Sequence, residues 1–383
     1  MNKKTFITDC EGPISLNDNA YELCAEFIPD GDEFFKKVSA FDDYLVEEVH
    51  KENYNAGDTL KLIVPFLIAY GLNNEKMIEF SKNNISLVNG AKETMEFAKI
   101  NLSSYIVSTS YCQYIEALTD YIDFPFLKTS YTLLDIDTHL NNDLDINNSN
   151  SNNSNSNSNN SNSNNSNSNN SNSNNNINDE KESEIKTLIA FKDEILKADF
   201  DRLEEIFFKE LPKLKIAKIM EKIITVGGVR KKFAVDTILE IDSNTPNRAM
   251  YVGDSITDVE PLRFIKENGG LAVSFNGNRH ALKEADIAVI SDNTIVTSIL
   301  IDLFNRYNKN YAIEFAKSYT IDPVWPFENL RLNFPLINKF REVFKDKENP
   351  IIAIVNDDNF DYVLEKSHDM RNKIRGKAKG GLV

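Results

Sequence analysis

Three short polar segments follow apolar runs in this sequence, and they contain residue types suited to acid–base and nucleophilic chemistry. Residues 9–12 (Asp-Cys-Glu-Gly), 108–110 (Ser-Thr-Ser) and 253–258 (Gly-Asp-Ser-Ile-Thr-Asp) each come directly after such a run. Taken alone, each segment reads as an ordinary cap of a strand or helix. If the apolar runs are parallel strands of one sheet, however, their carboxyl ends meet at one edge. A carboxylate positioned there beside a cation is able to act as a nucleophile.

The apolar runs predict the strands that would position these segments. We expect short strands at residues 5–8, 104–107, 129–134, 248–252, 271–274 and 287–290. Apolar residues at helical spacing lie between them, as in 232–241 and 296–305. Strands that alternate with helices are typical of a parallel, doubly wound sheet. The sequence therefore predicts an α/β, Rossmann-like fold.

The remaining segments add to this sheet. Residues 15–84 have helical apolar spacing throughout, and a second helical insertion is expected at 179–221. Residues 147–178 are almost entirely Asn and Ser, have nothing to bury, and predict a disordered linker. Residues 304–383 form a C-terminal extension whose basic end is expected to be solvated; its charged residues are Lys373, Arg375, Lys377 and Lys379.

Composition excludes several classes of function. The formal net charge is -16, so we expect no broad face for nucleic acid or anionic membranes. The 3 cysteines and 4 histidines are scattered singly, which predicts reduced thiols and no zinc site. No apolar run approaches the roughly 20 residues that span a bilayer, and the N-terminus does not resemble a signal peptide. The sequence thus predicts a cytoplasmic protein without direct membrane insertion.

In their order along the chain, the polar segments resemble the haloacid dehalogenase (HAD) superfamily of phosphatases. Its motifs are a nucleophilic Asp, a Ser or Thr, a Lys, and an acidic GD…D sequence, matched here by ITDCEG, IVSTS and YVGDSITD. Lys231 and Lys232 both precede Asp254 at a suitable spacing. Lys231 is favoured because the apolar residues that follow it match the rhythm of the family. The resemblance covers roughly residues 1–147 and 222–303, and it implies a core formed by 1–14, 85–146 and 222–303.

This resemblance implies a magnesium site made of oxygen ligands. Asp9, the main-chain carbonyl of Glu11, and Asp254 would bind the ion, with Asp258 coordinating it directly or supporting its ligands. Carboxylate and carbonyl oxygens are the ligands that suit Mg²⁺.

The same resemblance implies catalytic roles for four side chains. Asp9 would attack the phosphate ester and form an aspartyl-phosphate, while Ser108 and Lys231 would hold the phosphoryl oxygens. Glu11 would protonate the leaving alcohol and then activate water. Most phosphatases of the superfamily have Asp at the position of Glu11, and the extra methylene shifts the carboxyl group by about 1.5 Å. Enolase-phosphatases of the superfamily share the D-x-E-G pattern, so Glu is compatible with catalysis.

A helical segment between the first two motifs resembles the small C1 cap of phosphoserine-phosphatase-like members, and NGAKETMEFAKINLSSYIVSTS resembles their run into the second motif. A cap excludes water and selects small substrates. Candidate cap contacts, each also readable as an ordinary surface residue, are Asp18, Asn19, Glu22 and Lys61.

A narrower resemblance concerns the stretches ITDCEGPISLNDNAYELC, GDTLKLIVPFLIAYG and GLAVSFNGNRHAL. They look like an archaeal, methanogen family named energy-converting hydrogenase A, subunit R, whose members have the same HAD core. This resemblance implies peripheral contact with a hydrogenase complex. The chain itself has too few cysteines to hold an iron–sulfur cluster or nickel.

The leading hypothesis is Mg²⁺-dependent hydrolysis of a small phosphorylated metabolite by a HAD-type phosphohydrolase. The alternative is a non-catalytic or weakly catalytic accessory protein on the same fold, associated with the hydrogenase. Retention of Asp9, Ser108, Lys231, Asp254 and Asp258 favours the enzyme, because a scaffold has no need of that set of acids and donors.

Overall fold

A seven-stranded sheet forms the centre of the protein, in a computed structural model that describes residues 2–141 and 170–376. The strand order is β3-β2-β1-β4-β5-β6-β7, and each neighbouring pair is parallel except β6 with β7. The predicted α/β, doubly wound fold is confirmed. The strands are β1 (Thr5–Thr8), β2 (Ser103–Tyr111), β3 (Thr129–Thr132), β4 (Ala249–Gly253), β5 (Leu271–Phe275), β6 (Ile287–Ile290) and β7 (Ile351–Ala353).

Helices cover both faces of the sheet. Alternate residues of a strand point to opposite faces, and both faces here carry apolar side chains that the helices bury. Phe6 belongs to one apolar cluster, and its neighbour Ile7 belongs to another. The first cluster is completed by α5 (Ala91–Asn101), α6 (Cys112–Ile122), α14 (Ile295–Arg306) and α15 (Lys309–Ile321). The second is completed by α11 (Gly228–Ile241) and α12 (Val259–Glu267).

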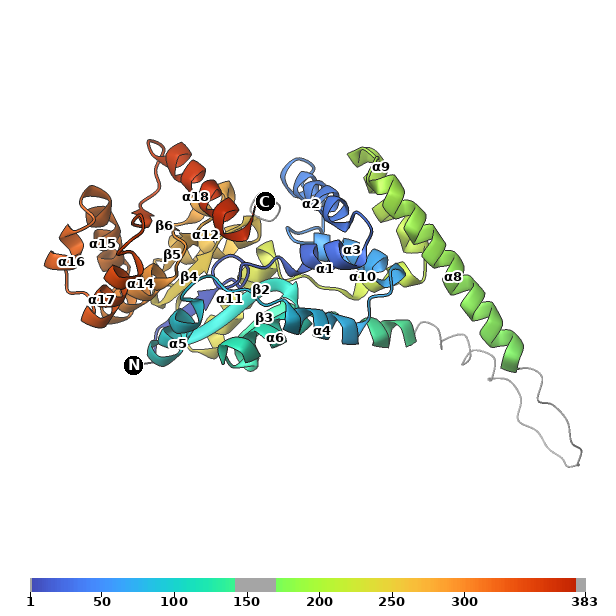
Figure 1. Cartoon of the computed structure of the whole chain (residues 1–383), viewed down its shortest axis with the longest axis horizontal. Helices are drawn as coiled ribbons and strands as arrows, with labels where there is room; N and C mark the ends of the chain where they lie inside the picture. Colours follow the sequence, from blue (N-terminus) through green and yellow to red (C-terminus); the bar gives the residue numbers. More distant parts are fainter. Residues whose placement is uncertain (1, 142–169, 377–383) are drawn as a thin grey trace, which may run out of the picture.

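A separate helical cap lies beside this core (Figure 1). Its helices follow β1 in the chain and have their own apolar cluster, which includes Phe34, Phe41 and Phe66. They are α1 (Asn19–Phe27), α2 (Gly31–Glu47), α3 (Thr59–Ala69) and α4 (Asn74–Asn83).

The second helical insertion packs against the cap. Leu188, Phe207 and Ile216 belong to the apolar cluster of the cap, and α8 contacts α2 and α3. The helices of this insertion are α8 (Asn170–Ile195), α9 (Phe200–Glu205) and α10 (Ile219–Lys222). Residues 147–169 of the expected linker lie outside the described residues. Residues 170–178, its last positions, belong to α8.

The C-terminal extension completes one edge of the sheet and returns to its centre. β7 pairs with β6 in antiparallel register, with Ile352 opposite Val289. The helices of the extension are α15, given above, α16 (Trp325–Asn329), α17 (Phe334–Val343) and α18 (Phe360–Arg375). α18 packs against α13 (Arg279–Glu284), a short helix of the core. Figure 1 shows the end of α18 directed toward the region between sheet and cap.

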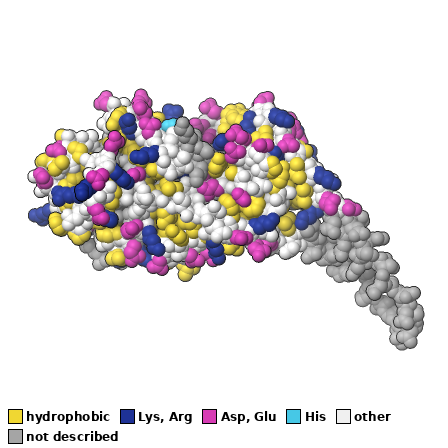
Figure 2. Space-filling model, in the orientation of Figure 1, with side chains coloured by type: hydrophobic (Ala, Val, Ile, Leu, Met, Phe, Trp, Pro, Cys, Tyr) yellow, Lys and Arg dark blue, Asp and Glu magenta, His cyan; other side chains and the backbone are white. Residues whose placement is uncertain are grey.

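Surface charge and helix hydropathy add two general observations. On the face shown in Figure 2, acidic and basic side chains are interspersed, and neither sign covers a broad area. Within the described residues, no helix is both long and apolar enough to cross a membrane.

Candidate active site

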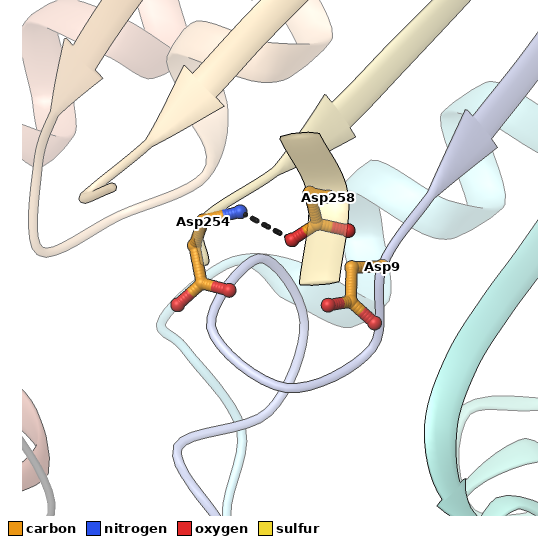
Figure 3. Close-up of side chains that lie close together, drawn as sticks. All are labelled: Asp9, Asp254 and Asp258. Atoms are coloured by element: carbon orange, nitrogen blue, oxygen red, sulfur yellow. Dashed lines mark hydrogen bonds between the residues drawn. The ribbon is translucent and has the colours of Figure 1, made fainter. Parts of the chain in front are cut away.

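The two polar loops that follow β1 and β4 meet at the carboxyl edge of the sheet. β1 and β4 are neighbours; after β1 the next strand, β2, lies on one side of this pair, and after β4 the next strand, β5, lies on the other. Ligands of doubly wound folds bind where the strand order changes direction in this way. Asp9, Asp254 and Asp258 each place a carboxylate oxygen within 4.8 Å of the others (Figure 3), and all three are buried.

The loop after β1 is shaped by Gly12, which has φ +99°. A Cβ at this position would lie 2.3 Å from Asp254 Oδ2, so a larger residue would displace that carboxylate. Asp9 is fixed by two main-chain contacts: its N–H donates to the Val252 carbonyl at 2.8 Å, and its Oδ1 accepts from Cys10 N–H at 2.7 Å. Glycine at this turn therefore allows the two loops to approach closely.

Lys231 joins the two loops. Its Nζ lies 2.8 Å from Asp9 Oδ2 and 2.7 Å from Asp258 Oδ1, and the side chain is fully buried. Burial alone would lower the pKa of Lys231, but the charges of Asp258 and Asp9 outweigh it and raise that pKa. Lys232, the alternative considered above, points elsewhere and pairs with Asp236 on α11. Of the two lysines, Lys231 is the one in the acidic cluster.

Asp258 is held by donor groups from four residues of the protein. Its Oδ1 accepts from Lys231 and from the Tyr251 hydroxyl at 2.7 Å, and its Oδ2 accepts from the N–H groups of Asp254 and Ser255 at 2.9 and 3.1 Å. Burial would raise the pKa of Asp258, but Lys231 and these hydrogen bonds lower it below its usual value. With its oxygens used in this way, Asp258 orients Lys231 and the loop that carries Asp254.

Asp9 lies in an environment that calls for a further positive charge. Burial, followed by the nearby charges of Asp258 and Asp254, raises the pKa of Asp9 well above its usual value, although Lys231 opposes the shift. A divalent cation would favour the ionised carboxylate. The donor set fits Mg²⁺, because buried carboxylates provide oxygen ligands close together. Asp9 and Asp254 would hold the ion, and the ligand role of the Glu11 carbonyl stays a prediction.

Glu11 faces the pocket at the start of the cap. Its Oε1 accepts from the N–H of Asn19 at 2.8 Å. Burial and then the charge of Asp18 raise the pKa of Glu11 to about 8. A carboxyl group with that pKa is protonated at neutral pH and is able to donate a proton.

The segment after β2 departs from the prediction. β2 continues to Tyr111, so Ser108 lies within the strand; it is buried, and its hydroxyl donates to Ser110 Oγ at 3.1 Å. Thr109 lines the pocket instead, and its hydroxyl donates to the Val226 carbonyl at 2.9 Å. The proposed phosphoryl contact of Ser108 stays a prediction.

A small cavity of about 110 Å³ opens onto these groups between core and cap. Asp9, Glu11 and Asp254 form part of its core side, and Phe35 and Asp42 from α2 form part of its cap side. Among the candidate cap contacts, Asp18 lines this cavity, Asn19 binds Glu11, Glu22 accepts from Asn17 at 2.8 Å, and Lys61 pairs with Asp58.

Two arginines of the C-terminal helix also line the cavity, far in sequence from the motifs that predict the site. Arg371 Nη1 lies 2.7 Å from Asp254 Oδ2, and Arg375 Nη1 lies 3.6 Å from the same atom. The expectation that Arg375 belongs to a solvated end is wrong: its side chain is 6% exposed, because it packs into the site. One feature of the sequence could have indicated this burial. Val363, Ser367, Arg371 and Arg375 follow one another at intervals of four positions, which puts all four on one helix face.

Comparison with known proteins gives similarity at the level of structure. No family model and no curated protein matches the chain. The solved gene product AF1437 from Archaeoglobus fulgidus is similar over 99% of both chains, with a TM-score of 0.74 and 28% identity. A phosphoserine phosphatase in its apo form gives a TM-score of 0.41, with 14% identity over 76% of this chain and 95% of that chain. A phospho-aspartyl intermediate analogue of phosphoserine phosphatase gives a TM-score of 0.40, with 13% identity over 75% and 93%.

These similarities differ in what they support. The first extends over the C-terminal extension as well as the sheet and cap. The α/β fold follows from the strand order and helix layers described above.

Proposed function

We propose that this protein is a Mg²⁺-dependent phosphatase of the HAD superfamily, which hydrolyses a small phosphomonoester through an aspartyl-phosphate on Asp9. The observation that carries the proposal is the buried contact of Lys231 with both Asp9 and Asp258 beside the Asp254 carboxylate. Burying this many charges is costly, and such sets are kept where chemistry needs them.

The residues of the chain account for both half-reactions. A carboxylate oxygen of Asp9 attacks phosphorus, the bond from phosphorus to the ester oxygen breaks, and the leaving oxygen takes a proton from Glu11. A water molecule then gives a proton to Glu11 and attacks phosphorus, the bond from phosphorus to the Asp9 oxygen breaks, and phosphate leaves with the Asp9 carboxylate restored. Lys231 holds Asp9 in place and offers positive charge to the phosphoryl oxygens. Mg²⁺, when bound, neutralises charge on the transferring group.

Substrate size follows from the cap. The cavity of about 110 Å³ between core and cap has room for a small phosphorylated metabolite only, unless the cap opens. We propose a phosphorylated amino acid or a sugar-like phosphate as the substrate class. Peripheral association with a hydrogenase complex remains a separate proposal, based on the sequence resemblance.

The test is phosphate release from an aryl phosphate and a panel of small phosphomonoesters, with Mg²⁺ and with EDTA. We expect turnover that requires Mg²⁺, and a fall of about three orders of magnitude or more in kcat for Asp9→Asn. The matched control is Asp236→Asn, the same change at a carboxylate that is 40% exposed on α11; its kcat should equal that of the unmodified protein.

Two outcomes would contradict the proposal. Equal loss of activity in both variants would mean that the Asp9 change acts through general damage. The absence of turnover across the panel, from protein shown to be folded, would favour the non-catalytic accessory role.

A further inference from the structure

The C-terminal helix α18 contacts the same carboxylate that the proposed function assigns to the metal. Arg371 Nη1 donates to Asp254 Oδ2 at 2.7 Å, to the Asp254 carbonyl at 3.2 Å and to the Asn276 carbonyl at 3.1 Å. The Arg371 residue is 4% exposed, so these contacts are made away from bulk water. One guanidinium therefore fixes both the side chain and the main chain of Asp254, and ties them to the loop after β5.

The same face of α18 makes further contacts at the carboxyl edge of the sheet, with the loop after β5 and with the loop after β1. Ser367 donates to the Gly277 carbonyl at 2.6 Å, after β5. Arg375 donates to the carbonyls of Leu16 and Asn17, at 3.4 and 3.0 Å, where the chain passes from β1 into the cap. The helix thus connects the segments that follow β1, β4 and β5, all of which surround the acidic cluster.

We propose that α18 is part of the active site and that Arg371 is a positioning residue, which sets the orientation of the Asp254 carboxylate for metal binding. This inference rests on the proposed function, because it assumes that Asp254 binds the ion. A guanidinium bound to Oδ2 restricts rotation of the Asp254 carboxylate. Partners of metal-binding side chains are typically worth about 10- to 100-fold in metal affinity.

Arg371 also has an effect on metal affinity in the opposite direction. The positive charge of Arg371 repels a divalent cation, so its removal would by itself tighten binding. We expect orientation to outweigh repulsion, because the guanidinium holds the Asp254 main chain as well as its carboxylate, and its loss frees the whole loop.

The experiment measures Mg²⁺ affinity directly, by isothermal titration calorimetry of the full chain after removal of metal with EDTA. We expect Arg371→Gln to weaken Mg²⁺ binding about 10- to 100-fold. Arg371→Lys keeps the charge but not the forked geometry, and should weaken binding less, by a few-fold. The matched control is Lys373→Ala, which removes an exposed positive charge from the same helix and should leave the affinity unchanged.

Thermal unfolding of each variant in EDTA tests whether it is folded. If Arg371→Gln does not fold, the Mg²⁺ affinity of Arg371→Lys tests the inference in its place. Affinity equal to or tighter than that of the unmodified protein in the folded Arg371→Gln variant would overturn the inference, as would an equal loss in Lys373→Ala. Failure of the proposed function is distinguishable: it would appear as no phosphate release from a protein whose Mg²⁺ binding still depends on Arg371.

Discussion

At the scale of single residues, the three aspartates differ in what their oxygen atoms contact. Asp258 accepts hydrogen bonds from four residues of the protein, whereas Asp254 is held by Arg371 and Asp9 by Lys231 and one N–H group. Residues of one chemical type therefore have separate tasks, set by their neighbours. The division follows from geometry: Asp258 is four residues after Asp254, close enough to cap the N–H groups of its own loop.

Glu11 provides a residue-scale prediction about pH. Its pKa is raised from 4.5 to about 8, so the folded protein binds a proton that the unfolded chain releases between these values. The stability that this proton contributes is fully present below about pH 4.5 and is lost as the pH rises through about 8. Glu11→Gln carries no charge, and relative to the unmodified protein it should gain stability on going from pH 5 to pH 8.5, by on the order of 1 kcal/mol or more.

The measurement is chemical denaturation of both proteins in EDTA at the two pH values. Other buried carboxyl groups are present in both chains, so the difference between the proteins isolates Glu11. A difference in unfolding free energy that does not change between pH 5 and pH 8.5 would contradict the raised pKa.

Which site residues the sequence could predict depends on how local their signal is. Asp9, Glu11, Asp254 and Asp258 lie in two short segments directly after apolar strands, and the structure brings these segments together. Arg371 could not be placed in the same way. It is more than a hundred positions from Asp254, and its position depends on the path of the whole C-terminal extension.

At the scale of secondary-structure elements, the start of α11 positions Lys231 and packs against the cap. Gly227 precedes the helix, and a Cβ there would lie 2.1 Å from the Ala56 carbonyl oxygen. Main-chain oxygen cannot move aside as a flexible side chain would. The absence of a side chain at Gly227 therefore sets how closely cap and core approach.

Gly227→Ala should lower the free energy of unfolding by about 1–3 kcal/mol, because the added methyl group forces the two segments apart. The effect should be measured by chemical denaturation, beside Val229→Ala as the control. Val229 is in the same turn and 44% exposed, so its truncation should have little effect. Equal stability of Gly227→Ala and the unmodified protein would show that the contact is easily relieved.

The expected elements agree with the structure where apolar periodicity determines them, and differ where packing does. All six predicted strands are present, with at most small shifts at the ends of all except β2. β2 runs past Ser108 to Tyr111, because Tyr111 is itself buried in the cap cluster and its hydroxyl binds the Leu60 carbonyl at 2.6 Å. The apolar pattern of residues 105–107 gives no information about that distant contact.

At the scale of the whole molecule, the cap and the second insertion form one apolar unit. Phe207 of the insertion lies 5.8 Å from Phe41 and 6.1 Å from Phe66, measured between ring centroids. Segments separated by more than a hundred residues thus share one core, while the sheet has its own clusters. The insertion is placed to support the cap, on the side away from the sheet (Figure 1).

Phe207→Ala should destabilise this unit by about 3–5 kcal/mol, because it leaves a cavity among buried aromatic rings. Hydrogen exchange should become faster in the cap and in α9, and should stay slow in β1, β4 and β5. Phe233→Ala, at a phenylalanine of α11 that is 58% exposed, is the control and should change neither region. Faster exchange throughout the sheet would mean that cap and core unfold together.

The short antiparallel strand β7 affects how this protein behaves toward copies of itself. β6 is a run of four buried residues, Ile287–Ile290, and β7 covers its outer edge. Without that cover, an apolar strand would present unpaired N–H and carbonyl groups to other chains, which is the usual starting point of edge-to-edge aggregation. Because β7 follows β6 only after α14 to α17 in the chain, we expect the edge of β6 to stay uncovered until the C-terminal extension has been synthesised.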